Sequence, residues 1–396
     1  METYLYEWLN YGVRFLHLIT GIAWIGASFY FVWLDNSLRE PPSWKKDKGI
    51  KGDLWAIHGG GFYEVAKYSL RPEEMPKTLH WFKWEAYTTG LTGFLLLTLM
   101  YYIGASSYTI DPAKMALTQW QAIGIGVGAI ALFIITYEVL CRTPLVEKGL
   151  YFGLTLLAIL TVFAYILDQI ISSRAMYIHI GAMLGLAMVF NVFTTIMPSQ
   201  RKMVAAVSQN EQPNPLWGHR AKLRSVHNNY ATLPVLLIMI SNHYPITYGN
   251  PYGWFILIAL IAITAYARHF FNLKHHGIIK PSILIIVLLA FATLVWVVAP
   301  KSSTTAKTSV STQQVMQVTN ARCLQCHSAK PTDEVFKVAP AGVIYDTEAE
   351  VIAKAERIYA RAVVSKDMPF MNKTQITEQE RQVIAQWYVG LKQPVQ

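Results

Sequence analysis

Long apolar segments recur over residues 1–299, separated by polar loops. Each is long enough to cross a hydrocarbon layer of about 30 Å as a helix. Because a helix satisfies its own backbone hydrogen bonds in lipid, the pattern predicts an all-α, polytopic bundle of eight transmembrane helices. The sixth segment is the shortest of the eight and contains Pro234. The predicted spans are 12–34, 86–104, 119–140, 150–167, 176–197, 229–243, 252–271 and 281–299.

Basic residues are distributed unevenly between the loops of this bundle. One set of alternate loops carries eighteen Lys and Arg residues, and the other set carries two. The positive-inside rule places the basic set in the cytoplasm, so we expect a bacterial inner-membrane protein with both termini in the periplasm. The N-terminal segment contains Glu2 and no basic run, so the first helix is expected to stay as an anchor. The basic loops are 35–85, 141–149, 198–228 and 272–280.

The composition supports a membrane location. Of the 396 residues, 53% are hydrophobic and 15% are charged, which is too apolar for a soluble chain of this length. The lipid bilayer is therefore the first expected partner. The formal net charge is +10, but the basic residues lie mostly in short loops between apolar runs, so no nucleic-acid binding is expected.

The composition changes after residue 299. Residues 300–313 are rich in Ser, Thr and Lys and are predicted to be a flexible linker between the membrane domain (1–299) and a small C-terminal domain (314–396). Near the end of that domain, Thr377 and Glu380 have the spacing of a helix capping box. An apolar stripe at helical period follows, made of Val383, Ile384, Trp387 and Leu391.

The C-terminal domain contains the most specific motif of the chain, Cys323-Leu324-Gln325-Cys326-His327. Covalent haem attachment needs two thiols on one turn of backbone and an adjacent histidine that reaches the iron, and C-x-x-C-H supplies both. A thioredoxin-like redox pair is disfavoured by the histidine and by the lack of a strand–helix context. The motif therefore predicts haem c, bound through Cys323 and Cys326 with His327 on the iron, in a class I cytochrome c domain.

The second axial ligand is expected downstream of the motif. No histidine occurs in 328–396, so a methionine thioether is the remaining ligand type. Met368 and Met371 are the two candidates, and Met368 is preferred because Pro369 follows it and restricts the loop. Ligation by histidine and methionine raises the reduction potential, as suits a carrier that passes electrons to a respiratory chain.

Ionisable residues near the outer ends of the predicted helices are functional candidates, because charge inside a membrane is costly. His17 and His179 are expected at a similar depth on helices 1 and 5, where they would ligate a haem b; hydrogen-bonded packing residues are the equally weighted alternative. The other outer candidates are Arg14, Asp168, Arg174 and His243.

A second set of candidates lies at the inner ends of the helices. His58 is followed by three glycines, which would let the backbone approach a ligand closely. Arg, His, Asn and aromatic side chains together suit a planar, anionic, amide-rich heterocycle, although for most single residues an ordinary loop role is the more frequent one. The set comprises His58, Glu85, Glu138, Arg224, His227, Asn228, Asn229, Arg268 and His269.

The chain resembles the membrane-bound, cytochrome-c-linked urate oxidases over nearly its whole length. The resemblance rests on GFYEVAKY (61–68), HWFKWEAYTTG (80–90), RSVHNNYATLP (224–234), SNHYP (241–245), ARCLQCHS (321–328) and DMPFMNKT (367–374). It implies an oxidoreductase that converts urate to 5-hydroxyisourate, with water as the oxygen source and haem c as the electron acceptor, without hydrogen peroxide. A soluble cytochrome c or a terminal cytochrome oxidase would accept the electrons next. The first helix, RFLHLITGIAWIG (14–26), also looks like the histidine-bearing first helix of small haem b membrane proteins.

A non-enzymatic membrane-anchored cytochrome c electron carrier is the alternative function. One helix would be enough for an anchor, so eight helices with polar residues inside them favour the enzyme. A haem–copper oxidase is disfavoured because it would need about a dozen helices and a histidine cluster for a binuclear metal, which this sequence lacks.

Overall fold

The computed structural model describes residues 2–69, 71–72, 74–299 and 310–392. Long helices form most of residues 2–299, as the apolar periodicity predicts. Two of them continue through π-helical turns: α3 extends through η1 (Thr98–Ile103), and α7 extends through η3 (Asn191–Ile196) into α8 (Met197–Ser208). The long helices are α1 (Glu2–Ser37), α3 (Trp84–Leu97), α5 (Gln119–Leu140), α6 (Gly149–Ile170), α7 (Ser173–Phe190), α9 (Pro215–Ser241), α11 (Gly253–His275) and α12 (Pro281–Val298).

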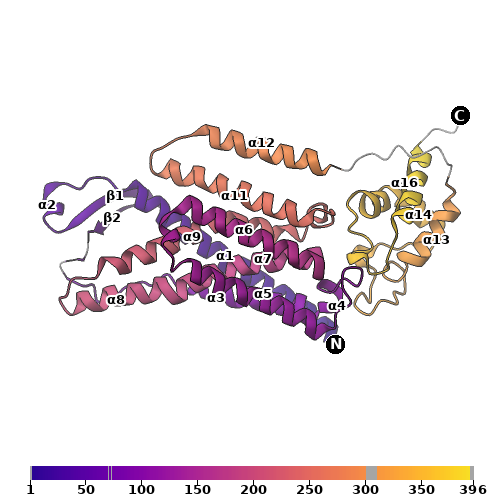
Figure 1. The fold of residues 1–396 in the computed structure, drawn as a ribbon, viewed down its shortest axis with the longest axis horizontal. Helices are drawn as coiled ribbons and strands as arrows, with labels where there is room; N and C mark the ends of the chain where they lie inside the picture. The colour runs from indigo at the N-terminus through magenta and orange to yellow at the C-terminus, as the bar shows by residue number, and fades with distance from the viewer. Residues whose placement is uncertain (1, 70, 73, 300–309, 393–396) are drawn as a thin grey trace.

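These helices run side by side between two ends of an elongated bundle (Figure 1). We call one end the hairpin end, because it carries α2 (Ser43–Lys46), β1 (Ile50–His58) and β2 (Gly61–Tyr68). The opposite end, the tail end, carries the start of α1, the short helix α4 (Ala105–Tyr108) and the C-terminal domain. The short connecting helices η2 (Pro144–Glu147) and α10 (Pro245–Tyr248) complete the bundle.

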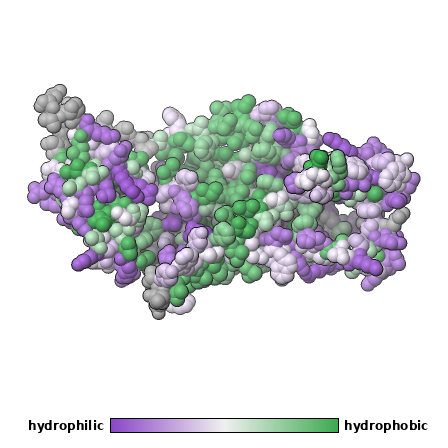
Figure 2. Space-filling model, turned by 180° about the vertical axis from the view of Figure 1, so that it is seen from behind, coloured by the Kyte–Doolittle hydropathy of each residue, from purple (hydrophilic) through white to green (hydrophobic). Residues whose placement is uncertain are grey.

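Seven helical segments among the described residues are long and apolar enough to cross a membrane, rather than the eight predicted. The helix predicted over 229–243 exists as part of α9, but α9 does not meet that standard of length and apolar composition. The segment from Arg224 to Asn229 lowers the apolar content of α9, and Arg224, Asn228 and Asn229 within it are buried in the protein. Apolar residues form a band around the middle of the molecule and polar residues gather at both ends (Figure 2), as expected of a multi-pass membrane protein.

The prediction of an all-α fold is wrong for the first long loop, which contains an antiparallel β-hairpin. Strand β1 pairs with β2, and His58 lies opposite Gly61. Gly59 and Gly60 form the turn with φ values of +56° and +82°, a left-handed conformation that glycine adopts most easily. The glycines after His58 therefore shape a hairpin turn, and the His58 side chain is exposed.

Helix α7 lies at the centre of the bundle core. Tyr177, Met176, Ile180 and Met183 are fully buried, and they pack among residues of α5, α6, α9 and α11. Gly181 permits close packing with α9, because a Cβ at this position would lie 2.6 Å from Ile238 Cγ2. The functional side chains of α7 and α9 are therefore held on two tightly packed helices.

The C-terminal domain has its own apolar core, to which Val315, Val351 and Ile384 contribute. The predicted capping box is confirmed: the Thr377 N–H donates to Glu380 Oε2 at 2.7 Å, and the Glu380 N–H donates to Thr377 Oγ1 at 3.2 Å. Ile384 and Trp387 are buried as predicted, whereas Leu391 is 46% exposed. Most of the predicted linker, 300–309, lies outside the described residues. The elements are α13 (Thr312–Arg322), η4 (Pro340–Gly342), α14 (Glu348–Ala353), α15 (Ala355–Ile358), η5 (Tyr359–Val364), η6 (Phe370–Asn372) and α16 (Glu378–Lys392).

Candidate functional site

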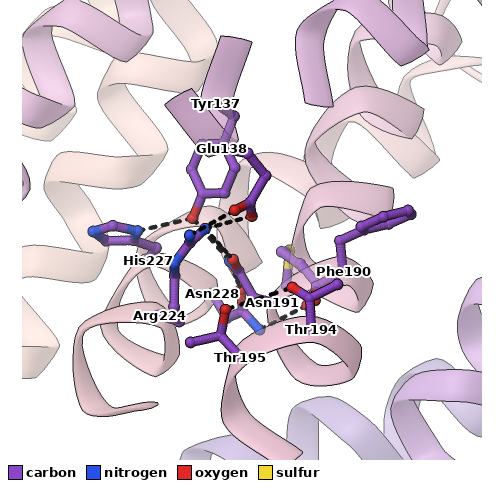
Figure 3. A network of polar contacts seen from close by, with 10 residues as sticks. Tyr137, Glu138, Phe190, Asn191, Thr194, Thr195, Arg224, His227 and Asn228 are labelled. Carbon is purple, nitrogen blue, oxygen red and sulfur yellow. Dashed lines mark hydrogen bonds and ion pairs between the residues drawn. The ribbon is translucent and has the colours of Figure 1, made fainter. Parts of the chain in front are cut away.

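A network of buried polar side chains connects α5, α7 and α9 in the half of the bundle nearer the hairpin end (Figure 3). Arg224 of α9 forms a bidentate pair with Glu138 of α5, with N–O distances of 2.8 and 2.9 Å. Arg224 is 8% exposed, so its charge is compensated by this carboxylate rather than by solvent. The structure thus brings together two residues that are 86 positions apart in the sequence.

Asn191 lies at the centre of this network. Its Oδ1 accepts from Arg224 Nη1 at 2.8 Å, and its Nδ2 donates to Tyr137 Oη at 2.9 Å and to Asn228 Oδ1 at 2.8 Å. Asn191 begins the π-helical turn η3, and single π-helical turns are frequent at functional sites. The amide is 1% exposed and makes hydrogen bonds to three other helical positions, so its orientation is fixed.

His227 completes the network on the side facing α5 and α6. Its Nδ1 lies 2.8 Å from Tyr137 Oη, and its ring stacks on Phe152 at a centroid distance of 4.4 Å. Tyr137 Oη also accepts from Asn191 Nδ2 and lies 3.3 Å from Asn191 Oδ1, so the hydroxyl joins the histidine to the amide. A cavity of about 30 Å³, enough for one water molecule, adjoins Tyr137, Asn191, His227 and Asn228.

A second buried arginine, on α11, is hydrogen-bonded to Asn229, the residue that follows Asn228 on α9. Arg268 of α11 is 3% exposed, and its Nε donates to Asn229 Oδ1 at 3.0 Å. Its guanidinium carbon lies 3.9 Å from the centre of the Phe29 ring of α1. Arg268 Nη2 and Asn229 Nδ2 are buried without a hydrogen-bond partner. Unlike the Arg224 network, this group is incompletely satisfied.

The outer candidates His17 and His179 contact different partners. His17 Nδ1 lies 3.1 Å from the Thr89 carbonyl oxygen and 3.0 Å from Thr92 Oγ1, and its ring packs against Gly93. His179 is fully buried beside Tyr102, at a ring-centroid distance of 5.8 Å. Its Nδ1 donates to the Ala175 carbonyl at 2.7 Å, and its Nε2 has no partner.

The expectation that His17 and His179 share a depth is not met. Gly93 and Tyr102, which pack against the two histidines, are nine residues apart on one continuous helix. At 1.5 Å per residue, these levels are separated by about 13 Å. Two axial ligands of one iron must approach within a few ångströms of each other, so this pair does not fit a haem b.

The remaining bundle candidates have individual roles. Arg14 Nη2 contacts Met100 Sδ at 2.9 Å and Asn10 Oδ1 at 3.3 Å. Asp168 accepts from Lys114 Nζ at 2.8 Å, which neutralises both charges. His243 is exposed in the turn after α9, whereas one carboxylate oxygen of Glu85, Oε2, is buried without a hydrogen-bond partner.

The Cys323, Cys326 and His327 backbones form one helical turn at the end of α13. The Cys326 N–H donates to the Cys323 carbonyl at 3.2 Å, and the His327 N–H donates to the same carbonyl at 2.9 Å. His327 Nδ1 donates to the Val343 carbonyl at 2.9 Å, which leaves Nε2 as the ring nitrogen with a lone pair. Burial raises the pKa of the Cys323 thiol to about 12 and that of Cys326 to about 11.

Met368 is held by backbone hydrogen bonds on both sides. Its N–H donates to the Arg361 carbonyl at 3.1 Å, and its carbonyl accepts from Arg381 Nη1 at 2.8 Å. Met371, the alternative ligand, has a φ of +55°, which places it in the left-handed region. The structure therefore fixes the backbone of Met368 more firmly than the sequence alone indicates.

The C-terminal domain contacts the tail end of the bundle through Phe370. The Phe370 ring lies edge-on to Tyr108 at a centroid distance of 5.4 Å. The Arg174 guanidinium lies 5.1 Å from the centre of Tyr108 and 5.2 Å from that of Phe370. Phe370 is two residues from Met368, so the bundle contact and the candidate haem ligand belong to one loop.

Two important residues of the buried network were not found by sequence reasoning. Tyr137 and Asn191 lie within apolar segments, and neither belongs to a recognisable motif. An amide inside a predicted span, as at Asn191, is the signal that would have found one of them. Tyr137 gives no such signal, because tyrosines are common in spans near the membrane interface.

The bundle corresponds to a known sequence family. The family model described as "Urate oxidase N-terminal" matches residues 3–299. No curated protein and no solved structure matches the chain. The matched range covers the buried networks of α5, α7, α9 and α11 and ends before the Cys323–His327 motif.

Proposed function

Because this chain belongs to the urate oxidase N-terminal family over residues 3–299, we propose that its membrane domain oxidises urate and transfers the electrons to a haem c in its C-terminal domain. The family match is the observation that carries the proposal. It supports a urate-related oxidoreductase, and the motif Cys323–His327 supplies the reason to add a cytochrome acceptor.

The proposed reaction is balanced without oxygen as a reactant. Urate and one water give 5-hydroxyisourate, two protons and two electrons; a C–O bond forms at the carbon that is oxidised. Haem c accepts and releases one electron at a time, so two successive transfers onward to a soluble cytochrome c or a terminal oxidase complete a turnover. No hydrogen peroxide is formed in this scheme.

The Arg224 network has the groups that proton movement in this reaction needs. Tyr137 Oη and His227 Nδ1 are 2.8 Å apart and share one hydrogen bond, so a proton can pass between the phenol and the imidazole. The adjoining cavity is lined by Tyr137, Asn191 and His227 and has room for one water. In our proposal the imidazole and the phenol accept and relay protons released from this water. The ion pair between Arg224 and Glu138 holds the side chains of the network in place.

The C-terminal site fits covalent haem better than a redox-active thiol pair. Reactive cysteines have depressed pKa values, but burial raises the pKa of both Cys323 and Cys326 above the ordinary range. In our proposal these sulfurs form thioethers, and His327 Nε2 and the Met368 sulfur bind the iron. In our proposal the C-terminal domain is a cytochrome domain that lies on the periplasmic side of a bacterial inner membrane.

The proposal is tested by mixing anaerobic, oxidised full-length protein with urate and following the α-band of haem c. We expect reduction of the haem and, when oxidised soluble cytochrome c is added to accept the further electrons, formation of 5-hydroxyisourate. A Cys323→Ala variant, which loses stable covalent haem, serves as the acceptor-deficient control. If the intact chain oxidises urate only with oxygen and with stoichiometric peroxide, the electron path through the C-terminal domain is wrong.

A further inference from the structure

Arg268 differs from every other buried cationic side chain in the described part of the molecule. Lys45 is paired with Asp53 and Glu64, and Arg224 is paired with Glu138. In the C-terminal domain, Arg381 lies 3.8 Å from Glu378 and also donates to backbone carbonyls. Within the described ranges, Arg268 is 3% exposed and has no carboxylate within 4.0 Å.

A buried and unpaired guanidinium inside a membrane protein is costly. Its charge is separated from water, and the desolvation cost is offset only by an opposite charge or by full hydrogen bonding. Among the residues that the structure describes, Arg268 has neither, because Nη2 has no hydrogen-bond partner and the hydrogen bond from Nε goes to the neutral Asn229 amide. The site therefore lacks one negative charge and at least one acceptor.

The unsatisfied atoms around Arg268 indicate the shape of the missing ligand. Arg268 Nη2 and Asn229 Nδ2 are both donors in need of acceptors. Asn272 Oδ1 is an unpartnered acceptor and lies one helical turn after Arg268 on α11. The Phe29 ring faces the guanidinium at 3.9 Å, which provides an aromatic surface for a flat ligand.

We propose that Arg268, Asn229 and Phe29 form the binding site of a planar organic anion with acceptor oxygens and ring N–H groups, which under the proposed function is urate itself. The ligand oxygens accept from Arg268 Nη2 and Asn229 Nδ2. Because the guanidinium now covers the face of Phe29, Phe29 turns aside to admit the ligand, whose ring then lies between the guanidinium and the Phe29 ring. Phe29 belongs to α1, whose membrane-spanning window has no buried residue (0%), so α1 is the peripheral helix that permits this movement.

The site lies at the same level of α9 as the Arg224 network. Asn228 and Asn229 are consecutive on α9, and Asn228 lines the cavity beside His227 whereas Asn229 faces Arg268 of α11. A substrate held by Asn229 is therefore at the level of the residues to which we assign proton transfer, on a neighbouring side of α9. The two arginines therefore have different roles in our proposal. Arg224 forms the ion pair that holds the polar network together, and Arg268 binds the anion.

The test uses Asn229→Asp in the full-length protein. The new carboxylate takes the place of an amide oxygen that already lies 3.0 Å from Arg268 Nε, so it supplies the missing charge from within the protein. We expect thermal stability to be kept or increased and urate affinity to fall by about 10- to 100-fold, the effect of losing a charged hydrogen-bonded pair. Binding is measured by equilibrium dialysis of labelled urate against dithionite-reduced protein, in which urate binds but is not oxidised.

Three further measurements make the result decisive. Asn242→Asp, the same substitution at the residue that follows α9, should leave affinity unchanged. Arg268→Gln should lose affinity to the same extent as Asn229→Asp, and competition by inorganic phosphate should be weak because phosphate is not planar. Unchanged urate affinity in both site variants, or equally strong competition by phosphate, would refute this binding site, whereas a wild-type chain that binds no urate would refute the proposed function as well.

Discussion

The residue scale shows how one chemical type acquires different roles from its surroundings. Arg224 and Arg268 lie on neighbouring helices and are both buried, yet Glu138 neutralises only Arg224. His179 and His227 are likewise both enclosed by aromatic rings, but only His227 is connected to other polar side chains through Tyr137. A residue's partners therefore decide its function more than its type or its depth in the bundle.

At this scale, the choice of haem ligand is directly testable. Met368→Ala should lower the reduction potential of haem c and remove the sulfur–iron charge-transfer absorption, because a poorer ligand replaces the thioether. Redox titration and a near-infrared spectrum measure the two effects. Met371→Ala is the matched control and should retain both properties; the opposite pattern would assign the ligand to Met371.

The element scale shows how helix irregularities and caps position the functional groups. The π-helical turn η3 begins at Asn191 and turns this amide toward Tyr137, Arg224 and Asn228. In the C-terminal domain, the cap of α16 brings Glu380 against Arg322 of α13, at 3.0 Å. This ion pair connects α16 to the helix that leads into the Cys323–His327 motif.

The α16 cap should make the C-terminal domain sensitive to acid. Burial alone would raise the pKa of Glu380, but hydrogen bonds from Thr377 and Arg322 outweigh it and hold the pKa below its ordinary value of 4.5. A carboxylate with a depressed pKa stabilises the fold above pH 4.5, and this contribution is lost as the pH falls through the lower, folded-state value.

We therefore expect Glu380→Gln to lower the free energy of unfolding of the C-terminal domain by about 0.2–1 kcal/mol at pH 7. The variant should also lose less of this stability on acidification than the wild type does. Hydrogen exchange of α16 in the full-length protein, corrected for the intrinsic effect of pH, measures the change at pH values on both sides of the transition. Glu334→Gln, at an exposed position of the same domain, is the control. Equal acid sensitivity in the wild type and Glu380→Gln would contradict this assignment.

At the scale of the whole molecule, the C-terminal domain lies against the tail end of the bundle and not against the hairpin end (Figure 1). The contact is made by Phe370, with Tyr108 and Arg174 of the bundle. A second approach occurs at Gly249, where a Cβ would lie 3.2 Å from the Ser365 carbonyl oxygen. In the proposed function, this interface brings the acceptor next to the domain that supplies the electrons.

Phe370→Ala removes the aromatic contact and should weaken the docking of the C-terminal domain on the bundle by about 0.5–1.5 kcal/mol. This corresponds to a docking equilibrium constant that is about 2- to 10-fold smaller. We expect the anaerobic rate of haem reduction by urate to fall in proportion, with little change in urate affinity. Stopped-flow spectroscopy measures the rate, and Val338→Ala, at an exposed position (78%) in the same domain, is the control. An unchanged rate would show that electrons enter the domain elsewhere.

The sequence by itself determined the helical bundle, the C-terminal C-x-x-C-H motif and the cap of α16. These features depend on local patterns: apolar runs of membrane-spanning length, C-x-x-C-H spacing, and a Thr–Glu pair three residues apart. It also indicated Arg224, His227 and Arg268 as candidates, because Arg, His, Asn and aromatic groups gathered at the inner ends of the helices suit a planar, anionic heterocycle. The hairpin at Gly59 and Gly60 was missed because a glycine run also suits ligand binding.

Only the tertiary structure decided which of these residues act together. A residue's position along a helix is readable from the sequence, but its level in the bundle and the direction of its side chain depend on helix packing and on irregular turns such as η3. His17 and His179 were therefore expected to meet, although they contact α3 and η1 at different levels. The partner of Arg224 and the absence of a carboxylate beside Arg268 within the described ranges also follow from packing, since Glu138 is far from both in the sequence and reaches only one of them.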